Sequence, residues 1–467
     1  MPIIIPANSA VSGGFDVDNS CRFNDGSSDY LTKSNSSAGS TSKSTISLWT
    51  KRSGTSSYQD IWESYNDGSN YFRFRFRDDN RLDMQSDISN STVFLKRTTR
   101  VFRDISAWYH ICVKIDLTQS NADKIKLFIN GTRETTFDNS TDLTSTSQQF
   151  VGGGGSYDFT IGRHPSSDAY YDGYMAEYVF IDGQALDPTS FGEFGEDSGI
   201  WKPIKVSGLT FGTNGFYLDF EDSSALGNDA AGSNNFTVNN LTAIDQSTDT
   251  CTTNFATLNS LAKGSSSTFS EGNLKSTTGG AYNTSTSTIG VSSGKWYWEY
   301  KLPASSLNYV LYGITTVEFS ANSSDVMTNF KTSYSKTAYA NEFRYNTAGG
   351  SYSTDTSGFS TDSTGDIVKI ALDLDNNFIY VGNGSSWFNS GNPTSGSNGT
   401  GAAKAVVAGV TYFPMMITLN NNMEINFGSP SFAISSGNAD GNGHGNFEYA
   451  VPSGYFSLNT KNLAEYG

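Results

Sequence analysis

The sequence predicts an all-β protein, built as two antiparallel β-sandwich domains that a polar connector joins. Aromatic residues and small turn formers are abundant, with 25 Tyr, 31 Phe and 47 Gly, whereas only 16% of the residues are charged. Short runs of β-branched and aromatic residues recur between polar turns, which is the pattern of strands linked by loops. A chain of 467 residues is also too long for one hydrophobic core, so two or three domains are expected.

The first half of the chain contains four segments with strand patterns. In the segment 70–78, Phe72, Phe74 and Phe76 alternate with arginines, so one face is expected in the core and the other in solvent. The segment 124–134 has a strand, an Asn-Gly turn and a return strand, which favours a hairpin. The segments 45–52 and 107–117 are apolar enough to be buried strands.

A second block of strand patterns begins near residue 268 and includes segments 292–303, 309–316, 366–388 and 412–428. One short helical turn is expected at 187–194, with Asp187 as its cap and Pro188 at its first position. The expected organisation is an attachment segment at 1–10, a first sandwich at 11–195, a connector packed on it at 196–267, a second sandwich at 268–435 and a C-terminal tail at 436–467.

Charge and cysteine content argue against several classes of protein. A net charge of −16 argues against nucleic-acid binding. No stretch approaches the roughly 20 apolar residues of a membrane span, and the opening MPIIIPANSA lacks the basic start of a signal peptide. Cys21, Cys112 and Cys251 are too few and too widely spaced for a disulfide framework or a zinc site, so we expect buried small hydrophobic residues.

The carboxylates and histidines form no catalytic pattern in the sequence. A sandwich glycosidase needs two carboxylates about 5 Å apart or farther, and the nearest same-face pair is Asp219 and Glu221. Glu177 stands alone in the apolar run 171–188, so we expect a structural carboxylate that bonds to a backbone N–H or an arginine and fixes the following turn. We therefore expect no enzyme, no catalytic residue and no metal ligand set.

Aromatic residues on loops are the remaining candidates, because such side chains on rigid sandwiches often contact glycans or proteins. The turn YNDGSN contains an Asp that could hold Ca²⁺, and no other cofactor is expected. The candidate ligand-binding residues are Trp62, Tyr65, Asp67, Tyr170, Tyr171 and Trp387.

Two resemblances to known families add to this interpretation. The first block resembles the concanavalin A-like, laminin-G-like sandwiches of structural proteins of tailed phages, especially marine ones, through FNDGSSDYLTK (23–33), TISLWTKRSG (45–54) and YDGYMAEYVFIDGQALDPTSFGEF (171–194). The second block resembles SPRY domains, through SGKWYWEY (293–300), YGITT (312–316) and YFPMMITLNNNMEINFG (412–428). The resemblances imply a jelly roll followed by a bent sandwich that presents loops to partners and has no catalytic residues.

The tandem resemblance implies a non-enzymatic structural and adhesion protein on the exterior of a tailed-phage virion, as a tail fibre, tail tip or capsid decoration made in the host bacterial cytoplasm. The expected partners are other virion proteins and a host-surface glycan or protein, with assembly as a homo-oligomer such as a trimer. Ile3, Ile4 and Ile5 could add a strand to a neighbouring protein and so attach the chain. Two alternatives stay open: a glycan-degrading sandwich enzyme and a bacterial lectin.

Overall fold

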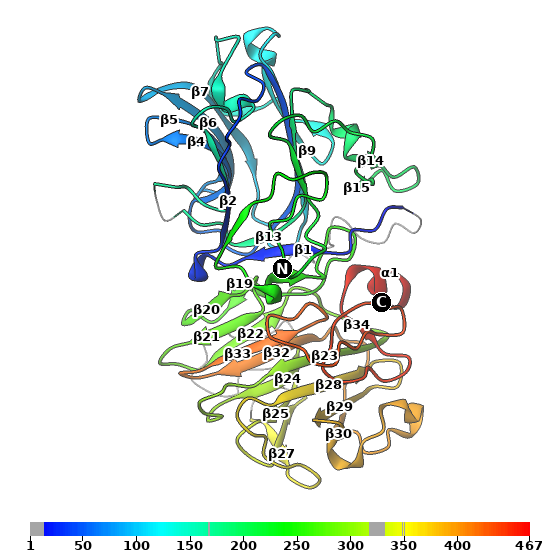
Figure 1. Cartoon of the computed structure of the whole chain (residues 1–467). Helices are drawn as coiled ribbons and strands as arrows, with labels where there is room; N and C mark the ends of the chain where they lie inside the picture. The colour runs from blue at the N-terminus through cyan, green and yellow to red at the C-terminus, as the bar shows by residue number, and fades with distance from the viewer. Residues whose placement is uncertain (1–13, 167–168, 317–331, 348, 350) are drawn as a thin grey trace. The chain divides into compact units, whose positions relative to one another are not determined.

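The computed structural model describes residues 14–166, 169–316, 332–347, 349 and 351–467. The chain divides between Thr253 and Asn254 into two compact units. Each unit is an antiparallel β-sandwich, as the sequence predicts (Figure 1). We call them the first and the second sandwich. The expected attachment segment at 1–10, with Ile3, Ile4 and Ile5, lies outside the described residues.

The first sandwich consists of two large sheets and a small hairpin of β14 (Gly192–Phe194) and β15 (Trp201–Pro203). Sheet 1 contains, in spatial order, β10 (Thr132–Arg133), β9 (Ile125–Ile129), β8 (Tyr109–Asp116), β3 (Lys43–Arg52), β13 (Gly173–Asp182), β1 (Ser20–Phe23) and β18 (Gln246–Ser247), with β16 (Phe216–Leu218) beside β13. Sheet 2 contains β11 (Phe137–Thr141), β7 (Ser91–Val101), β6 (Arg81–Ile88), β5 (Asn70–Phe76), β4 (Gln59–Asp67), β12 (Asp158–Ile161), β2 (Tyr30–Lys33) and β17 (Thr237–Asn239).

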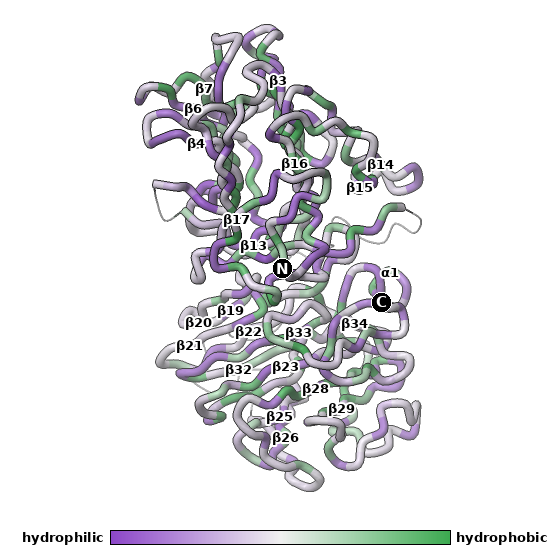
Figure 2. Tube along the Cα trace, in the orientation of Figure 1, coloured by the Kyte–Doolittle hydropathy of each residue, from purple (hydrophilic) through white to green (hydrophobic). Residues whose placement is uncertain are grey.

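The alternation along β5 decides which face of sheet 2 enters the core. Phe72, Phe74 and Phe76 are at most 1% exposed, as their spacing predicts. Rings from both sheets meet between them, since Trp62 of β4 lies 5.3 Å from the Phe180 ring of β13. Hydrophobic positions recur along the strands of both sandwiches, between connecting segments that are mostly neutral or hydrophilic (Figure 2).

The predicted hairpin at 124–134 is confirmed as β9, a two-residue turn and β10. Asn130 and Gly131 have φ angles of 48° and 73°, the left-handed conformation that a tight hairpin turn of this type requires. The three cysteines are buried, as expected.

The segment expected as a separate connector is divided between the two units. Strands β15 to β18 belong to the first sandwich, where β18 pairs with β1. Buried ion pairs fix this segment, with Lys51 Nζ 2.7 Å from Asp249 and Arg22 Nη2 3.3 Å from Asp245. The part beyond Thr253 belongs to the second sandwich, so the unit boundary lies inside the predicted connector.

The second sandwich also consists of two sheets. Sheet 3 contains β19 (Leu258–Lys263), β22 (Asn283–Ser287), β32 (Phe413–Thr418), β24 (Leu311–Thr315), β25 (Ser333–Thr337), β26 (Phe343–Asn346) and β27 (Ser353–Asp355). Sheet 4 contains β20 (Ser267–Ser270), β21 (Lys275–Thr278), β33 (Asn422–Asn426), β23 (Lys295–Lys301), β28 (Ile367–Asp373), β29 (Phe378–Asn383) and β30 (Ser386–Trp387), with β31 (Lys404–Ala405) beside β29 and β34 (Phe456–Ser457) beside β23.

The C-terminal segment, expected as a tail, packs on the second sandwich. Its strand β34 pairs in parallel with β23, and the helix α1 (Thr460–Tyr466) follows. Asp440 fixes the segment, because one carboxylate oxygen accepts from Ser457 N at 2.9 Å and from Asn462 Nδ2 at 2.8 Å.

Helical structure is minor. The predicted turn near Asp187 is present as η4 (Pro188–Ser190), with Asp187 at the N-cap position. The other short 3-10 segments are η1 (Asp25–Ser27), η2 (Asn121–Asp123), η3 (Gln149–Val151), η5 (Ala243–Asp245), η6 (Phe388–Ser390) and η7 (Pro393–Asn398). None of the helices in the described ranges has the length and hydropathy needed to cross a membrane.

Candidate binding site

The outer face of sheet 2 carries a row of opposite charges across four neighbouring strands. Asp60 of β4 lies opposite Arg75 of β5, Arg75 lies opposite Asp83 of β6, and Asp83 lies opposite Arg97 of β7. Cross-strand neighbours on one face are close enough to interact directly. The alternation of β5 therefore places its arginines in a charged row on the face opposite the core.

A bulge in β4 adds a second carboxyl group to this face. The register of β4 and β5 shifts between Asp60 and Trp62, so Ile61 and Trp62 both enter the core. A bulge changes the alternation of the following residues. Glu63 consequently shares the outer face with Asp60, although the two are three residues apart.

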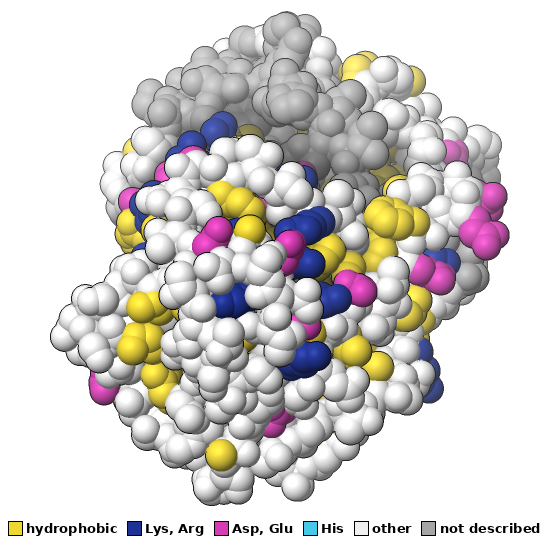
Figure 3. Space-filling model, turned by 90° about the horizontal axis from the view of Figure 1, so that it is seen from above, with side chains coloured by type: hydrophobic (Ala, Val, Ile, Leu, Met, Phe, Trp, Pro, Cys, Tyr) yellow, Lys and Arg dark blue, Asp and Glu magenta, His cyan; other side chains and the backbone are white. Residues whose placement is uncertain are grey.

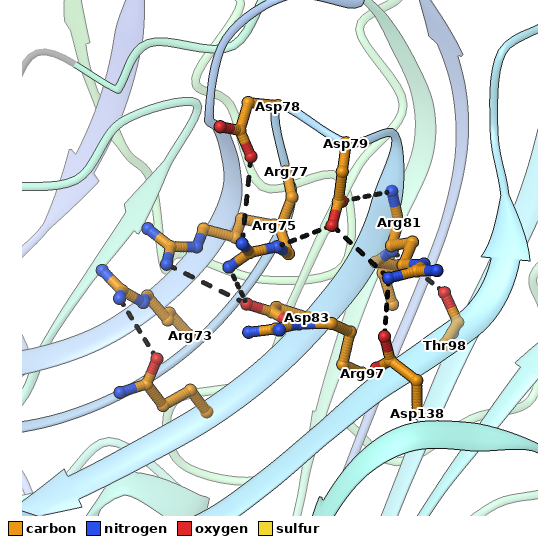
Figure 4. Close-up of polar contacts among 12 residues, drawn as sticks. Arg73, Arg75, Arg77, Asp78, Asp79, Arg81, Asp83, Arg97, Thr98 and Asp138 are labelled. Atoms are coloured by element: carbon orange, nitrogen blue, oxygen red, sulfur yellow. Dashed lines mark hydrogen bonds and ion pairs between the residues drawn. The ribbon is translucent and has the colours of Figure 1, made fainter.

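Asp83 is the centre of the charged row. Its carboxylate lies 2.8 Å from Arg97 Nε, 3.1 Å from Arg77 Nη1 and 4.0 Å from Arg75 Nη2. Figure 4 shows the carboxylate between these guanidinium groups. Asp83 is only 1% exposed. One buried carboxylate thus holds three planar cations in fixed orientations.

Tyr58 packs on the same arginines. Its ring centre lies 4.4 Å from Arg75 Cζ and 5.2 Å from Arg77 Cζ. Guanidinium groups stack favourably on aromatic rings. The half-buried Tyr58 ring therefore extends the charged row with an aromatic surface.

Asp60 and Glu63 are fully buried, and no backbone or arginine N–H among the described residues donates to their carboxyl oxygens, although the two carboxyl groups interact with each other. Glu63 Oε1 lies 3.3 Å from His164 Nδ1. Burial raises the pKa of Asp60 to about 7 and that of Glu63 to about 8, while the nearby Arg73 and Arg75 lower both pKa values. Burial also lowers the pKa of His164 to about 4. The two carboxyl groups of this corner therefore titrate near neutral pH, well above the ordinary range of carboxyl groups.

Two of the predicted ligand-binding residues are core residues instead. Trp62 is 1% exposed, because the bulge turns it inward against Phe180. Tyr171 is fully buried, and its hydroxyl group lies 2.5 Å from Thr50 Oγ1 and donates to Lys51 O at 3.0 Å. Both are therefore excluded as direct ligand contacts.

Two other predicted residues, Tyr65 and Asp67, belong to β4, one of the strands that carry the charged row. The ring centres of Tyr65 and His164 are 6.2 Å apart, and the Tyr65 hydroxyl group lies 2.5 Å from Ser166 Oγ. Asp67 fixes its own turn, because its carboxylate accepts from Ser69 N at 2.8 Å and from Asn70 Nδ2 at 3.0 Å. No cluster of three or more His, Cys, Asp or Glu suited to a metal ion occurs among the residues that the structure describes.

The remaining predicted aromatics make cation–π contacts. The Tyr170 ring centre lies 6.2 Å from the ring centre of Tyr30. It also lies 5.5 Å from Arg163 Cζ. Trp387 belongs to the second sandwich, where Lys369 Nζ lies 4.6 Å from its ring. Both are half-buried, and their role in ligand binding stays a prediction.

Glu177 has a different partner from the one expected. Its carboxylate accepts from Tyr217 Oη at 2.7 Å, and burial raises its pKa to about 7. The following turn is fixed by Thr45, whose hydroxyl group donates to Gln184 O at 2.9 Å and accepts from Leu186 N at 2.8 Å. Glu177 occupies the register shift of β13 with a φ of 50°, so the sequence alternation gave no guide to its contacts.

The sequence did not single out Tyr58, Asp60, Glu63 or Asp83 as site residues. The Phe and Arg alternation of β5 was the available signal, because it marked the polar face on which these residues lie. On the face of the molecule in Figure 3, basic and acidic side chains lie close together among mostly uncharged groups. This mixture agrees with the low charged fraction of the chain.

Comparison with known proteins agrees with a sandwich of the lectin type. Residues 25–189, which are less than half of the chain, match the family described as the Concanavalin A-like lectin/glucanases superfamily. No curated protein matches the chain.

Solved structures give weaker likenesses. The SPRY domain of human HERC1 is 14% identical, with 36% of this chain and 96% of that chain covered and a TM-score of 0.28. Domains LG4-5 of the mouse laminin alpha1 chain are 11% identical, with 87% and 84% covered and a TM-score of 0.29. A putative carbohydrate binding protein from Bacteroides ovatus is 16% identical, with 48% and 59% covered and a TM-score of 0.35. Likenesses at these values assign no function to the chain.

Proposed function

We propose that this chain is a non-enzymatic adhesion protein on the exterior of a tailed-phage virion, and that it binds host-surface glycan through the outer face of β4 to β7. The phage assignment rests on the motif resemblance of the first and second blocks. The glycan assignment is supported by the lectin-type family match over residues 25–189. The observation that carries the binding role is the set of guanidinium groups held by Asp83.

This arrangement suits a ligand rich in hydroxyl and carboxyl groups. Arg75, Arg77 and Arg97 present planar donors whose orientation Asp83 fixes before any ligand arrives. Groups that are already ordered lose little conformational freedom on binding. Tyr58 offers an aromatic ring directly beside these donors.

Glycan binding is testable by affinity electrophoresis of the full chain in gels that contain dextran, mannan, laminarin or alginate. We expect Arg77→Ala to weaken binding roughly tenfold, as the loss of a well-placed arginine does at other binding sites. Arg100→Ala is the matched control, because Arg100 is exposed and pairs with Glu134 at 3.0 Å outside the charged row. Equal binding by both variants and the wild type would exclude this face.

The virion assignment needs a separate experiment. Electron microscopy of phage particles with an antibody to this chain distinguishes tail from capsid, and an unlabelled particle would contradict the assignment. Removal of residues 1–10 is expected to abolish incorporation if this segment attaches the chain. Normal incorporation of the truncated chain would leave the attachment idea without support.

A glycan-degrading enzyme is the second candidate, because the family that matches residues 25–189 includes glucanases and because Asp60 and Glu63 are a pair of carboxyl groups with raised pKa values. Glycosidases use two carboxyl groups, one of which keeps its proton near neutral pH. The assay is the release of new reducing ends from the same polysaccharides. Release that Asp60→Asn and Glu63→Gln abolish would replace the non-enzymatic proposal, and Asp219→Asn with Glu221→Gln tests the pair that the sequence suggested.

A further inference from the structure

Four tyrosines and an arginine gather at one end of sheet 3 in the second sandwich. Tyr282 precedes β22, Tyr309 precedes β24 and Tyr339 follows β25. Leu311 pairs with Thr337 of β25, and β24 and β22 both pair with β32, so the antiparallel order brings these three positions to the same end of the sheet. Arg344 of β26 completes the group, together with Tyr352 beside β27.

In this tyrosine cluster, each side chain contacts the next one, from Tyr282 through Tyr309, Tyr339 and Arg344 to Tyr352. The Tyr282 and Tyr309 ring centres are 5.3 Å apart and perpendicular, and the Tyr309 and Tyr339 rings are 6.1 Å apart. Arg344 Cζ lies 4.7 Å from the Tyr352 ring, and Arg344 Nη2 donates to Tyr339 Oη at 3.0 Å. The five groups therefore form one contiguous cluster, in which Tyr309 is exposed, Arg344 is buried and the other three tyrosines are half-buried.

Tyr309 has two properties that core packing does not explain. Its side chain is 44% exposed, although its ring is large and mostly apolar. Its φ of 63° is a left-handed conformation, which is unfavourable for a bulky residue. This φ angle belongs to a tight turn that Val310 N closes by donating to Leu307 O at 3.1 Å, so the exposed ring is carried by a hydrogen-bonded turn.

The charges of the cluster balance. Arg344 Nη2 lies 2.8 Å from Glu342 Oε2, so the guanidinium has a carboxylate partner within the cluster. The cluster therefore attracts neither anions nor cations strongly. Its remaining features are aromatic faces surrounded by hydroxyl, guanidinium and carboxylate groups.

We infer that the tyrosine cluster is a second binding site, for a neutral sugar residue of a polysaccharide, centred on the Tyr309 ring. A sugar ring has an apolar C–H face and a rim of hydroxyl groups. The C–H face would pack on Tyr309, and the hydroxyl groups would bond to tyrosine Oη atoms, Arg344 and Glu342. A protein partner of ordinary interface size would need a larger apolar surface than one exposed ring.

This site is independent of the proposed glycan binding by the first sandwich, because every residue in it belongs to the second sandwich. Either site can be present without the other. A chain that has both would bind a long polysaccharide more tightly than each site alone, since the second contact becomes intramolecular.

The test uses the full chain in affinity gels that contain dextran, mannan or laminarin. Tyr309→Asn removes the ring but keeps a residue that tolerates positive φ, so the fold is retained. We expect roughly tenfold weaker binding of the neutral polysaccharide that the wild type binds, and near wild-type binding by Tyr309→Phe. Leu261→Ala is the control, because Leu261 is exposed at 66% in the same sandwich but outside the cluster.

Two results would overturn this inference: wild-type affinity in Tyr309→Asn, or absence of neutral polysaccharide binding by the wild type. Arg77→Ala, run on the same gels, separates the two sites. Loss of binding in Arg77→Ala alone supports only the first sandwich, and loss in Tyr309→Asn alone supports only the tyrosine cluster. Capture of a protein by the cluster, with unchanged glycan binding, counts against the inference.

Discussion

Sheets 2 and 4 each carry buried carboxyl groups on the face away from the core. Only on sheet 4 do other parts of the chain supply backbone N–H donors to such a group. On sheet 4, Glu299 accepts from the backbone N–H groups of Glu448 and Tyr449 at 2.9 and 2.8 Å and from Tyr297 Oη at 2.8 Å. On sheet 2, the oxygens of Asp60 and Glu63 have no such donors among the described residues.

The difference shows what the C-terminal segment contributes. It supplies two backbone N–H donors to the Glu299 carboxylate. It also places the Tyr449 ring centre 4.9 Å from Lys369 Nζ, so the charged groups of this face are paired within the chain. Asp60 and Glu63 have raised pKa values instead, because buried carboxyl groups without N–H donors are costly when charged. The two faces therefore accommodate a buried carboxyl group in different ways, one through hydrogen-bond donors and the other through raised pKa values.

The largest expected effect is on the outer face of sheet 4. Glu299→Ala leaves two part-buried backbone N–H groups without an acceptor, so we expect the free energy of unfolding to fall by about 3 kcal/mol. Urea unfolding of the full chain measures this change. Glu448→Ala is the control, because it keeps its backbone N–H and is expected to cost about 0.5 kcal/mol. Equal costs for the two variants would remove the distinction between the faces.

A smaller effect is expected from the pH dependence of the outer face of sheet 2. The pKa of Glu63 is raised to about 8 in the folded state from the ordinary value of 4.5, so between these pH values the folded chain binds a proton that the unfolded chain has released. Stability from this group therefore falls as pH rises through that window. Glu63→Gln removes the effect, so the variant should gain roughly 1.5 kcal/mol relative to wild type between about pH 6.5 and 8.

Urea unfolding of both proteins at the two pH values measures this gain. The range above about pH 6.5 is chosen because His110 and His164 have lowered folded pKa values and act in the opposite sense below it. Glu193→Gln serves as the reference, since its side chain is 57% exposed. A gain that does not change with pH in Glu63→Gln would mean that the carboxyl is ionised in the folded chain.

The smallest effect is expected at Asp67, an exposed carboxylate that its own turn already satisfies. Asp67→Ala should lower the free energy of unfolding by about 0.5 kcal/mol. Melting curves with and without millimolar Ca²⁺ check this, and both proteins should respond alike. Stabilisation of the wild type alone by Ca²⁺ would show a calcium site at this turn.

The sequence predicted which side chains face the core wherever apolar and polar residues alternate along a strand. The prediction failed where a bulge interrupts this alternation. The alternation of Phe72, Phe74 and Phe76 identified the core face of sheet 2 and, by exclusion, its polar face. The bulge after Asp60 could not be read from the sequence, so Trp62 was predicted on the wrong side and Glu63 was missed. A bulge is one extra residue whose position depends on the partner strand.

The end of the first sandwich was unpredictable for a related reason. Strands β16 to β18 have two or three residues each, too few for a periodic signal. They are fixed by contacts between distant residues, such as Lys51 with Asp249, which are 198 positions apart. The family match ends at residue 189, but the unit needs this later segment to pair its buried charges.

The pairing of β1 with β18 has a mechanical consequence. Ser20 at the start of β1 pairs with Ser247 at the end of β18, so the chain enters and leaves the first sandwich at the same end of one antiparallel pair. A pulling force on the two ends would open this ladder one bond at a time rather than shear all its bonds together. The Val17–Thr252 hydrogen bonds and the buried Lys51–Asp249 ion pair lie just outside this ladder, so such a force would reach them before it reaches β1 and β18.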